Sequence, residues 1–121
     1  MSLHVAGLKV KPVMQLCRAL GDETRLRIVA LLSHGELCTC HVEAALQLSQ
    51  PNASRHFGIL RTAGVVEPRR EGNWVYYRLA TQPDPERRKV LAAIVKNFGS
   101  LELLKDDVAR LLQSKGPRSC R

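Results

Sequence analysis

The chain has 121 residues, of which 45% are hydrophobic, 25% are charged and four are cysteines. A chain of this length is expected to form one domain and to fold without disulfide or metal cross-links. Its longest apolar runs are much shorter than the ~20 residues that cross a bilayer, and its first residues lack the apolar core of a secretory signal. These properties predict a cytoplasmic protein without membrane association, in which the cysteines are thiols or metal ligands.

The charge balance is strongly basic. Nineteen Lys and Arg against eleven acidic residues give a formal net charge of +8. Such an excess suits a polyanionic partner, because contacts between cations and phosphates release condensed counterions. A merely soluble basic protein has the same balance, so the placement of the cations along the chain must decide between the two.

The first quarter of the chain has helical periodicity with clear end signals. We expect a first helix over residues 8–20, ended by Gly21. A second helix begins with Asp22 as its N-cap, and Gly35 stops it.

The next segment predicts a helix-turn-helix unit. A short helix over about 40–46 is followed by a longer one that has Ser49 as N-cap, Pro51 in its first turn and Gly64 as terminator. Two short helices joined by a brief turn are typical of DNA-binding helix-turn-helix units.

The second helix of this unit has the two faces that a groove-inserted helix requires. Its apolar side carries Ala53, Phe57 and Leu60, which would anchor it to the core. Its start is rich in side chains that hydrogen-bond to bases or phosphates. These candidates for DNA contact are Ser49, Gln50, Asn52, Ser54, Arg55 and His56.

After this helix the apolar period changes to the alternation of a β-hairpin. Residues 71–73 supply the turn, and Pro68 places the first strand at an edge because proline lacks a backbone donor. Arg69, Arg70 and Arg78 concentrate positive charge on this hairpin, as a wing that crosses the DNA backbone would need. A helix-turn-helix followed by a basic hairpin predicts a mainly α, winged-helix fold. We interpret the strand aromatics as packing residues rather than base-stacking platforms.

The helical period returns after Pro85 and continues to the end of the domain. Leu101, Leu104, Val108 and Leu111 follow a three-then-four spacing that resembles a coiled-coil seam. We interpret this seam as a dimer interface in preference to intramolecular packing. Residues 1–115 then form the DNA-binding and dimerisation domain, and residues 116–121 form a flexible C-terminal tail.

Three blocks in order resemble the ArsR (arsenic-resistance repressor) family of metal-sensing repressors. They are ALGDETRLRIVALL, ELCTCHVEAALQLSQPNASRHFGILRTAGVV and RREGNWVYYRL, and the match covers about residues 16–79. The resemblance implies a homodimer, joined through terminal helices, that occupies double-stranded operator DNA until an inducer binds. It also implies a recognition segment at 49–56 and a wing tip at 69–73, which adds Asn73 to the DNA-contacting candidates.

A pair of cysteines lies at the start of the short helix. Two residues two positions apart point about 200 degrees away from each other in a regular helix, so Cys38 and Cys40 can share one ion only at a helix end. The sequence places them at such an end, with Thr39 or Cys38 as the cap. Thiolates select soft, thiophilic ions. The segment ELCTCHVE also resembles the family's inducer site, which implies As(III), with Sb(III), Cd(II) or Zn(II) as alternatives, and no organic cofactor.

The sequence leaves the identity of the third ligand open. Many arsenite sensors of the family carry a third cysteine where this chain has Glu43. We favour Cys120 on the C-terminal tail, of either subunit, over Cys17, which is expected to be a core residue. His41 is the other candidate and would favour Zn(II) or Cd(II). Some family members bind metal on the last helix through acid and histidine ligands, but Asp106 and Asp107 have no nearby histidine, so we predict no such second site.

The expected switch is conformational. Drawing both sulfurs onto one ion would unwind the first turn of the short helix and shift the recognition helix, so that the DNA-competent state loses affinity. Alternatives are a redox switch that closes as a disulfide and an architectural DNA-binding protein without an inducer. A small thiol enzyme is disfavoured because the two-residue cysteine spacing of disulfide oxidoreductases is absent. We therefore expect no enzymatic activity.

Overall fold

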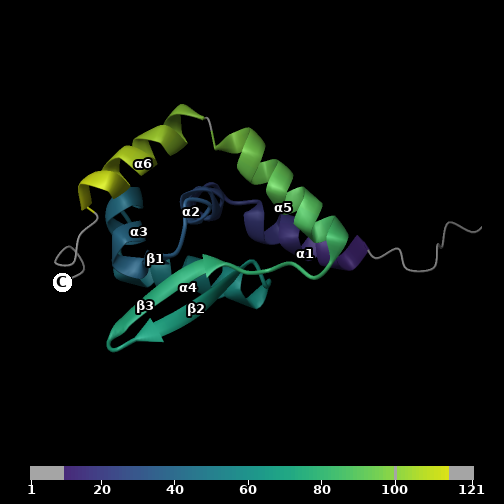
Figure 1. Cartoon of the computed structure of the whole chain (residues 1–121), viewed down its shortest axis with the longest axis horizontal. Helices are drawn as coiled ribbons and strands as arrows, with labels where there is room; N and C mark the ends of the chain where they lie inside the picture. Colours follow the sequence, from purple (N-terminus) through teal and green to yellow (C-terminus); the bar gives the residue numbers. More distant parts are fainter. Residues whose placement is uncertain (1–9, 100, 115–121) are drawn as a thin grey trace, which may run out of the picture.

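The computed structural model describes residues 10–99 and 101–114 (Figure 1). The predicted tail at 116–121, with Cys120, lies outside the described residues. The helices are α1 (Val10–Leu20), α2 (Glu23–Leu32), α3 (Thr39–Leu46), α4 (Gln50–Thr62), α5 (Pro85–Phe98) and α6 (Glu102–Ser114). The strands are β1 (Leu37–Cys38), β2 (Val66–Glu71) and β3 (Trp74–Leu79). This is the predicted, mainly helical fold with a small β-wing.

Local side chains determine where the helices begin. The Asp22 carboxylate accepts a hydrogen bond from the Arg25 backbone N–H at 3.0 Å and caps α2. The Ser49 hydroxyl accepts one from the Asn52 N–H at 3.3 Å and caps α4. Both caps satisfy backbone donors that have no partner inside the helix, and both were predicted. Gly64, after α4, has a φ of +74°, a conformation that side chains rarely adopt.

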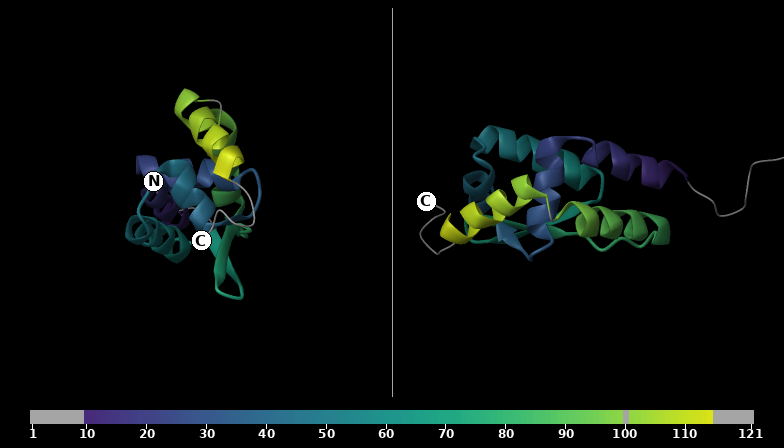
Figure 2. Two further views of the ribbon diagram at one scale, coloured as in Figure 1. Left: turned by 90° about the vertical axis from the view of Figure 1, so that its left-hand side faces the viewer. Right: turned by 90° about the horizontal axis from the view of Figure 1, so that it is seen from above.

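The wing is an antiparallel sheet in the order β1-β3-β2. Glu71 pairs with Trp74 across a two-residue turn, whose first residue Gly72 has a φ of +61°. Pro68 lies on the edge strand β2, as predicted. The strand β1 was not predicted, because a strand of two residues shows no alternation; its Leu37 pairs with Tyr77 of β3. Figure 2 shows the β2–β3 hairpin projecting from the helical body.

The hydrophobic core lies where the first four helices meet the base of the wing. Leu16 of α1, Ile28 of α2, Val42 of α3 and Phe57 of α4 are fully buried in it. Tyr77 of β3 packs against this cluster, which confirms a packing role for that aromatic residue. None of the helices within 10–99 and 101–114 is long and apolar enough to cross a membrane.

The last two helices pack on different parts of the body. In Figure 1, α5 runs along α1, whereas α6 lies over α3 and also contacts α2. Leu104 and Leu111 of the predicted coiled-coil seam are buried in these contacts within the chain. Our preference for a dimer interface over intramolecular packing was therefore wrong for these two residues. The spacing predicts an apolar stripe correctly, but it does not say which helix covers the stripe.

A second apolar surface stays uncovered in the single chain. Val10 and Met14 on α1 and Phe98 at the end of α5 are exposed. They lie on the two helices that pack side by side at one end of the molecule.

Candidate functional site

The helix α4 presents a polar surface and buries an apolar one, as a recognition helix must. Gln50, Asn52, Ser54 and Arg55 are exposed. Ala53, Phe57 and Leu60 are buried and anchor the helix to the core. Ser49 is exposed as well, but its hydroxyl is also engaged as the helix cap. Five of the six DNA-contacting candidates in 49–56 therefore lie on the outer surface.

His56 is the exception, and the structure corrects its predicted role. Its side chain is only 7% exposed, and its ring lies against the body of the molecule. His56 belongs to the stripe 53, 56, 57, 60, whose helical spacing predicts burial. This helical spacing is the sequence signal that marks His56 as a buried residue.

The buried ring lies in a polar cluster at the start of α2. The His56 Nδ1 atom lies 3.8 Å from an Asp22 carboxylate oxygen and 3.3 Å from an Arg25 guanidinium nitrogen. Arg25 also donates to the Ala19 carbonyl at 2.6 Å. Burial lowers the pKa of His56, helped by the nearby charges of Arg55 and Arg25 and opposed by Asp22. Arg25, for which no role was predicted, links α1, α2 and α4.

The wing cations differ in their partners. Arg69 binds Glu36 at 2.6 Å and Glu71 at 2.8 Å, and its guanidinium lies 4.8 Å from the centroid of the Tyr76 ring. Its hydrogen bonds hold the pKa of the Glu36 carboxyl below its usual value. Among the described residues, Arg70 has no ion pair. Arg78 pairs with Glu67 at 2.6 Å, so Arg70 is the freest of the three predicted hairpin cations.

Between α3, α4 and the wing there is a groove of about 470 Å³. Gln50 and Ser54 of the recognition helix and Arg70 of the wing line it, so the groove joins the two predicted DNA-contacting elements. Two further residues in it, Arg61 and Glu43, were not predicted as part of this surface. Burial raises the pKa of the Glu43 carboxyl. The groove therefore combines two arginines and several hydrogen-bonding side chains with one acidic group. Its other lining residues are Thr39, Ala53, Phe57, Pro68, Val75 and Tyr77.

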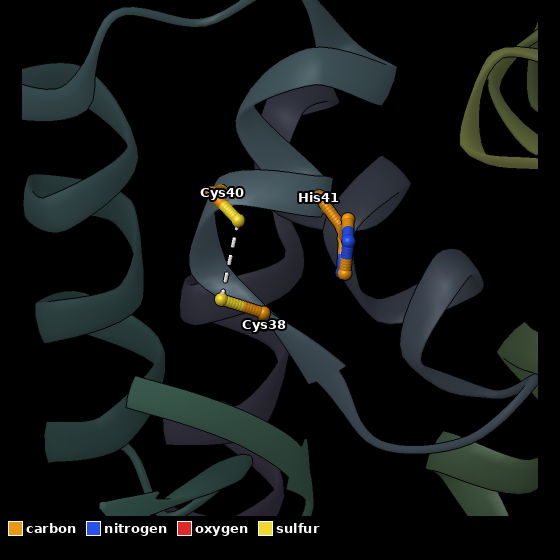
Figure 3. Close-up of side chains that lie close together, drawn as sticks. All are labelled: Cys38, Cys40 and His41. Carbon is orange, nitrogen blue, oxygen red and sulfur yellow. Dashed lines mark hydrogen bonds between the residues drawn. The ribbon is translucent and has the colours of Figure 1, made fainter. Parts of the chain in front are cut away.

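The cysteine pair has the helix-end geometry that the sequence predicts. Cys38 ends β1 and is the N-cap of α3, with an extended backbone at φ −67° and ψ 143°. Because Cys38 lies outside the helix, its side chain can approach Cys40 on the first turn. The two Sγ atoms lie 3.3 Å apart, at hydrogen-bond distance (Figure 3). The first turn of α3 is intact in this arrangement, and its unwinding on ion binding stays a prediction.

His41 completes a three-residue cluster. One ligand atom from each of Cys38, Cys40 and His41 lies within 4.8 Å of the others. Cys38 is buried, whereas Cys40 and His41 are half-buried, so an ion can reach the cluster from solvent. Two sulfurs and one imidazole form a soft donor set, which fits a thiophilic ion and not Mg²⁺ or Ca²⁺.

The other ligand candidates are placed elsewhere. Cys17 on α1 is exposed, which corrects the expectation that it is a core residue. Asp107 is buried on α6, where it binds Arg27 and Arg110 rather than a metal-ligating partner. Cys120 lies outside the described ranges.

Comparisons with known proteins agree with this arrangement. The family model described as "Bacterial regulatory protein, arsR family" matches residues 22–67. The arsenic resistance transcriptional regulator ArsR1 of Pseudomonas putida is 40% identical over 113 residues, which are 91% of this chain and 84% of that protein. The arsenical resistance operon repressor of Escherichia coli is 53% identical over 68 residues, 55% of this chain and 58% of that protein.

A solved structure extends the likeness to the fold. The homodimeric winged helix-turn-helix DNA-binding domain from Mycobacterium bovis, a possible ArsR-family regulator, has a TM-score of 0.60 and 29% identity, and the match covers 74% of this chain and 86% of that one. The extent of the Pseudomonas match, with the winged helix and the thiol pair, shows the family. This chain belongs to the ArsR family of DNA-binding transcriptional regulators.

Proposed function

We propose that this chain represses transcription by occupying operator DNA and leaves the operator when As(III) binds the thiolates of Cys38, Cys40 and Cys120. The observation that carries this proposal is the 3.3 Å separation of the Cys38 and Cys40 sulfurs at the head of α3. Relatives named as arsenic resistance regulators support the choice of inducer. Sb(III), which has the same thiophilic chemistry, is expected to act in the same way.

The sulfur spacing favours a pyramidal ion. A tetrahedral zinc with bonds of about 2.3 Å holds two thiolates about 3.8 Å apart. The narrower bond angles of a pyramidal As(III) thiolate bring the sulfurs closer together, as they are here. The observed separation of 3.3 Å between the two sulfurs is therefore nearer to the spacing in a pyramidal site than to that in a tetrahedral one.

A second candidate inducer follows from His41. Its ring nitrogen belongs to the same cluster as the two sulfurs, and two thiolates with one imidazole suit Zn(II) or Cd(II). In that case Cys120 is not needed. The two candidate inducers therefore differ in whether they require Cys120, and substitution of that residue can distinguish them.

The position of the pair supports coupling to DNA. The thiols lie at the start of α3, and α3 packs against the recognition helix α4. An ion that prefers one arrangement of these helices lowers the population of the other. A coupling of roughly 3 kcal/mol corresponds to about a hundredfold loss of operator affinity.

We infer that the DNA-bound form is a homodimer, joined by the exposed apolar residues of α1 and α5. Val10, Met14 and Phe98 would be covered by a second copy, and the Mycobacterium relative is described as homodimeric. A two-fold dimer would place two recognition helices on two operator half-sites.

The test is operator release by the reduced, purified protein. Its binding to the DNA upstream of its own gene is measured by fluorescence anisotropy while arsenite, zinc or cadmium is added. We expect release by arsenite, and we expect Cys38→Ser to bind DNA normally but to ignore arsenite. Cys17→Ser removes an exposed thiol away from the pair and serves as the matched control, with wild-type release.

The other outcomes separate the alternatives. Release by zinc or cadmium but not by arsenite, with loss of the response in His41→Ala, assigns the site to a divalent ion. Release by peroxide, with a mass decrease of two hydrogen atoms as two thiols become a disulfide and peroxide is reduced to water, indicates a redox switch. DNA binding that ignores every one of these agents leaves an architectural protein.

A further inference from the structure

The two faces of the wing differ in the arginines that they carry. In an antiparallel pair, residues directly opposite each other lie on the same face of the sheet. Arg70 of β2 is opposite Val75 of β3, and both line the groove between the wing and α4. Arg69 is opposite Tyr76, one position further along each strand, so it lies on the other face. We call these the groove face and the outer face of the wing.

The arginines of the outer face are already paired within the protein. Arg69 binds Glu36 at 2.6 Å and Glu71 at 2.8 Å. Arg78, which shares this face, binds Glu67 at 2.6 Å. A phosphate that approached the outer face would have to compete with three carboxylates for two guanidinium groups.

The groove has two cations without such partners. Arg70 of β2 and Arg61 of α4 are exposed, and neither has an ion pair in the part of the chain that the structure describes. Both line the groove of about 470 Å³, and Glu43 is the acidic residue among its described lining residues. Two arginines against one acid leave the groove with a net positive charge, which suits a phosphate group.

Arg61 lies on the same side of α4 as two of the predicted DNA-contacting residues. Gln50, Ser54, Phe57 and Arg61 follow a four-three-four spacing, which places them on one stripe of the helix. The helix axis from Gln50 to Arg61 is about 16 Å long at 1.5 Å per residue, whereas the major groove of B-DNA is about 12 Å wide. When the start of α4 lies in the major groove, Arg61 at the far end of the stripe therefore lies near the bordering DNA backbone.

We propose that the groove between α4 and the wing is a binding site for the DNA backbone, in which Arg61 and Arg70 hold the same phosphodiester segment. This inference rests on the operator binding of the proposed function and adds Arg61, which was not predicted, to the DNA-binding residues. Guanidinium groups bind phosphate oxygens through several N–H donors. Phosphate contacts fix the register of a protein on DNA without reading its sequence, so the site positions both α4 and the wing on the operator.

The charge contacts are tested by measuring operator binding by fluorescence anisotropy over a range of salt concentrations. Arg61→Ala and Arg70→Ala are each expected to weaken binding about tenfold and to reduce the salt slope by about one unit. Arg61→Lys should keep the wild-type salt slope, because it keeps the charge. Arg78→Ala removes one charge from the outer face and is the matched control, with a wild-type slope. An equal loss in Arg78→Ala would indicate a general effect of net charge and would overturn the site.

The position of the contact is tested by ethylation interference on the operator. An ethyl group removes the charge of one phosphate, so binding is weakened where the protein contacts that phosphate. We expect one or two neighbouring phosphates to lose this effect in Arg61→Ala, and the same phosphates to lose it in Arg70→Ala. An unchanged pattern in Arg61→Ala, or changes at distant phosphates in the two variants, would overturn the shared site.

Two further outcomes distinguish a free anion from DNA, and this inference from the proposed function. If no operator phosphate depends on Arg61, while millimolar inorganic phosphate raises the Tm of the wild type but not of Arg61→Ala, the groove holds a free anion and the assignment to DNA is overturned. A wild-type protein that leaves the operator with arsenite, but whose DNA affinity does not depend on Arg61, overturns this inference alone. A wild-type protein that does not bind operator DNA overturns both.

Discussion

Phe57 of the recognition helix stacks on Tyr77 of the wing, with ring centroids 4.2 Å apart and 11° between the ring planes. Phe57 is fully buried in α4, and Tyr77 pairs with Leu37 on one side and with Pro68 on the other. Both predicted DNA-contacting elements therefore meet in one aromatic contact. We therefore expect this stack to orient the wing relative to the helix.

Replacing Tyr77 with Ala should loosen the wing as well as destabilise the fold. Loss of a half-buried ring and its aromatic partner is expected to cost about 2 kcal/mol of unfolding free energy, measured by urea denaturation. Operator affinity should fall as well, at temperatures where the variant is folded. Tyr77→Phe keeps the stack and serves as control. Unchanged DNA affinity of folded Tyr77→Ala would show that the stack does not orient the wing.

The buried His56 should make stability depend on pH. Because burial lowers its pKa, the folded chain keeps His56 neutral at pH values where an unfolded histidine, with a pKa of about 6.5, takes up a proton. The unfolded state then binds more protons, so the stability present above pH 6.5 is lost as the pH falls toward the lower, folded-state pKa of His56. The slope of this loss is at most about 1.4 kcal/mol per pH unit.

The measurement compares unfolding free energies at pH 7 and pH 5 for the wild type and for His56→Gln, which cannot titrate. We expect a shallower pH dependence in the variant. The pKa of Asp22, which faces the ring, is lowered by the Arg25 backbone N–H, so its titration lies below this window. Parallel pH profiles of the two proteins would contradict the assignment.

Arg55 should provide an electrostatic contact to operator DNA. It is exposed on α4 and has no acidic partner among the described residues. Arg55→Ala is expected to weaken operator binding about tenfold and to reduce the salt slope by about one unit, without a change in As(III) affinity. Lys89→Ala removes an exposed cation from α5 and is the matched control. An equal effect of both variants would point to net charge instead of a contact.

Glu43 should weaken DNA binding, because its carboxylate lies in the groove between recognition helix and wing. Glu43→Gln is expected to tighten operator binding by about two- to fivefold, as expected for one partly screened charge, and the gain should shrink as salt is added. Glu102→Gln makes the same change of net charge on an exposed site of α6. If Glu102→Gln tightens binding as much, the groove has no special role.

Much of the fold follows from signals that act within a few residues. The caps at Asp22 and Ser49, the turn at Gly72 and the edge position of Pro68 were all predictable, because each depends on bonds or backbone angles inside one short segment. The placement of Cys38 and Cys40 at a helix end was predictable for the same reason. The two-residue strand β1 was not, because it forms only by pairing with β3.

The sequence by itself determined a winged helix with a thiol pair at the head of one helix, since periodicity, caps and cysteine spacing are local properties. Only the tertiary structure decided that His56 faces Asp22 and that Arg69 is held by Glu36. It also decided that α6 docks on its own subunit through the ion pair of Arg27 and Asp107. These partners are 33 to 80 residues apart in the sequence. An apolar or charged face indicates that a partner is needed, but it does not show which distant segment supplies that partner.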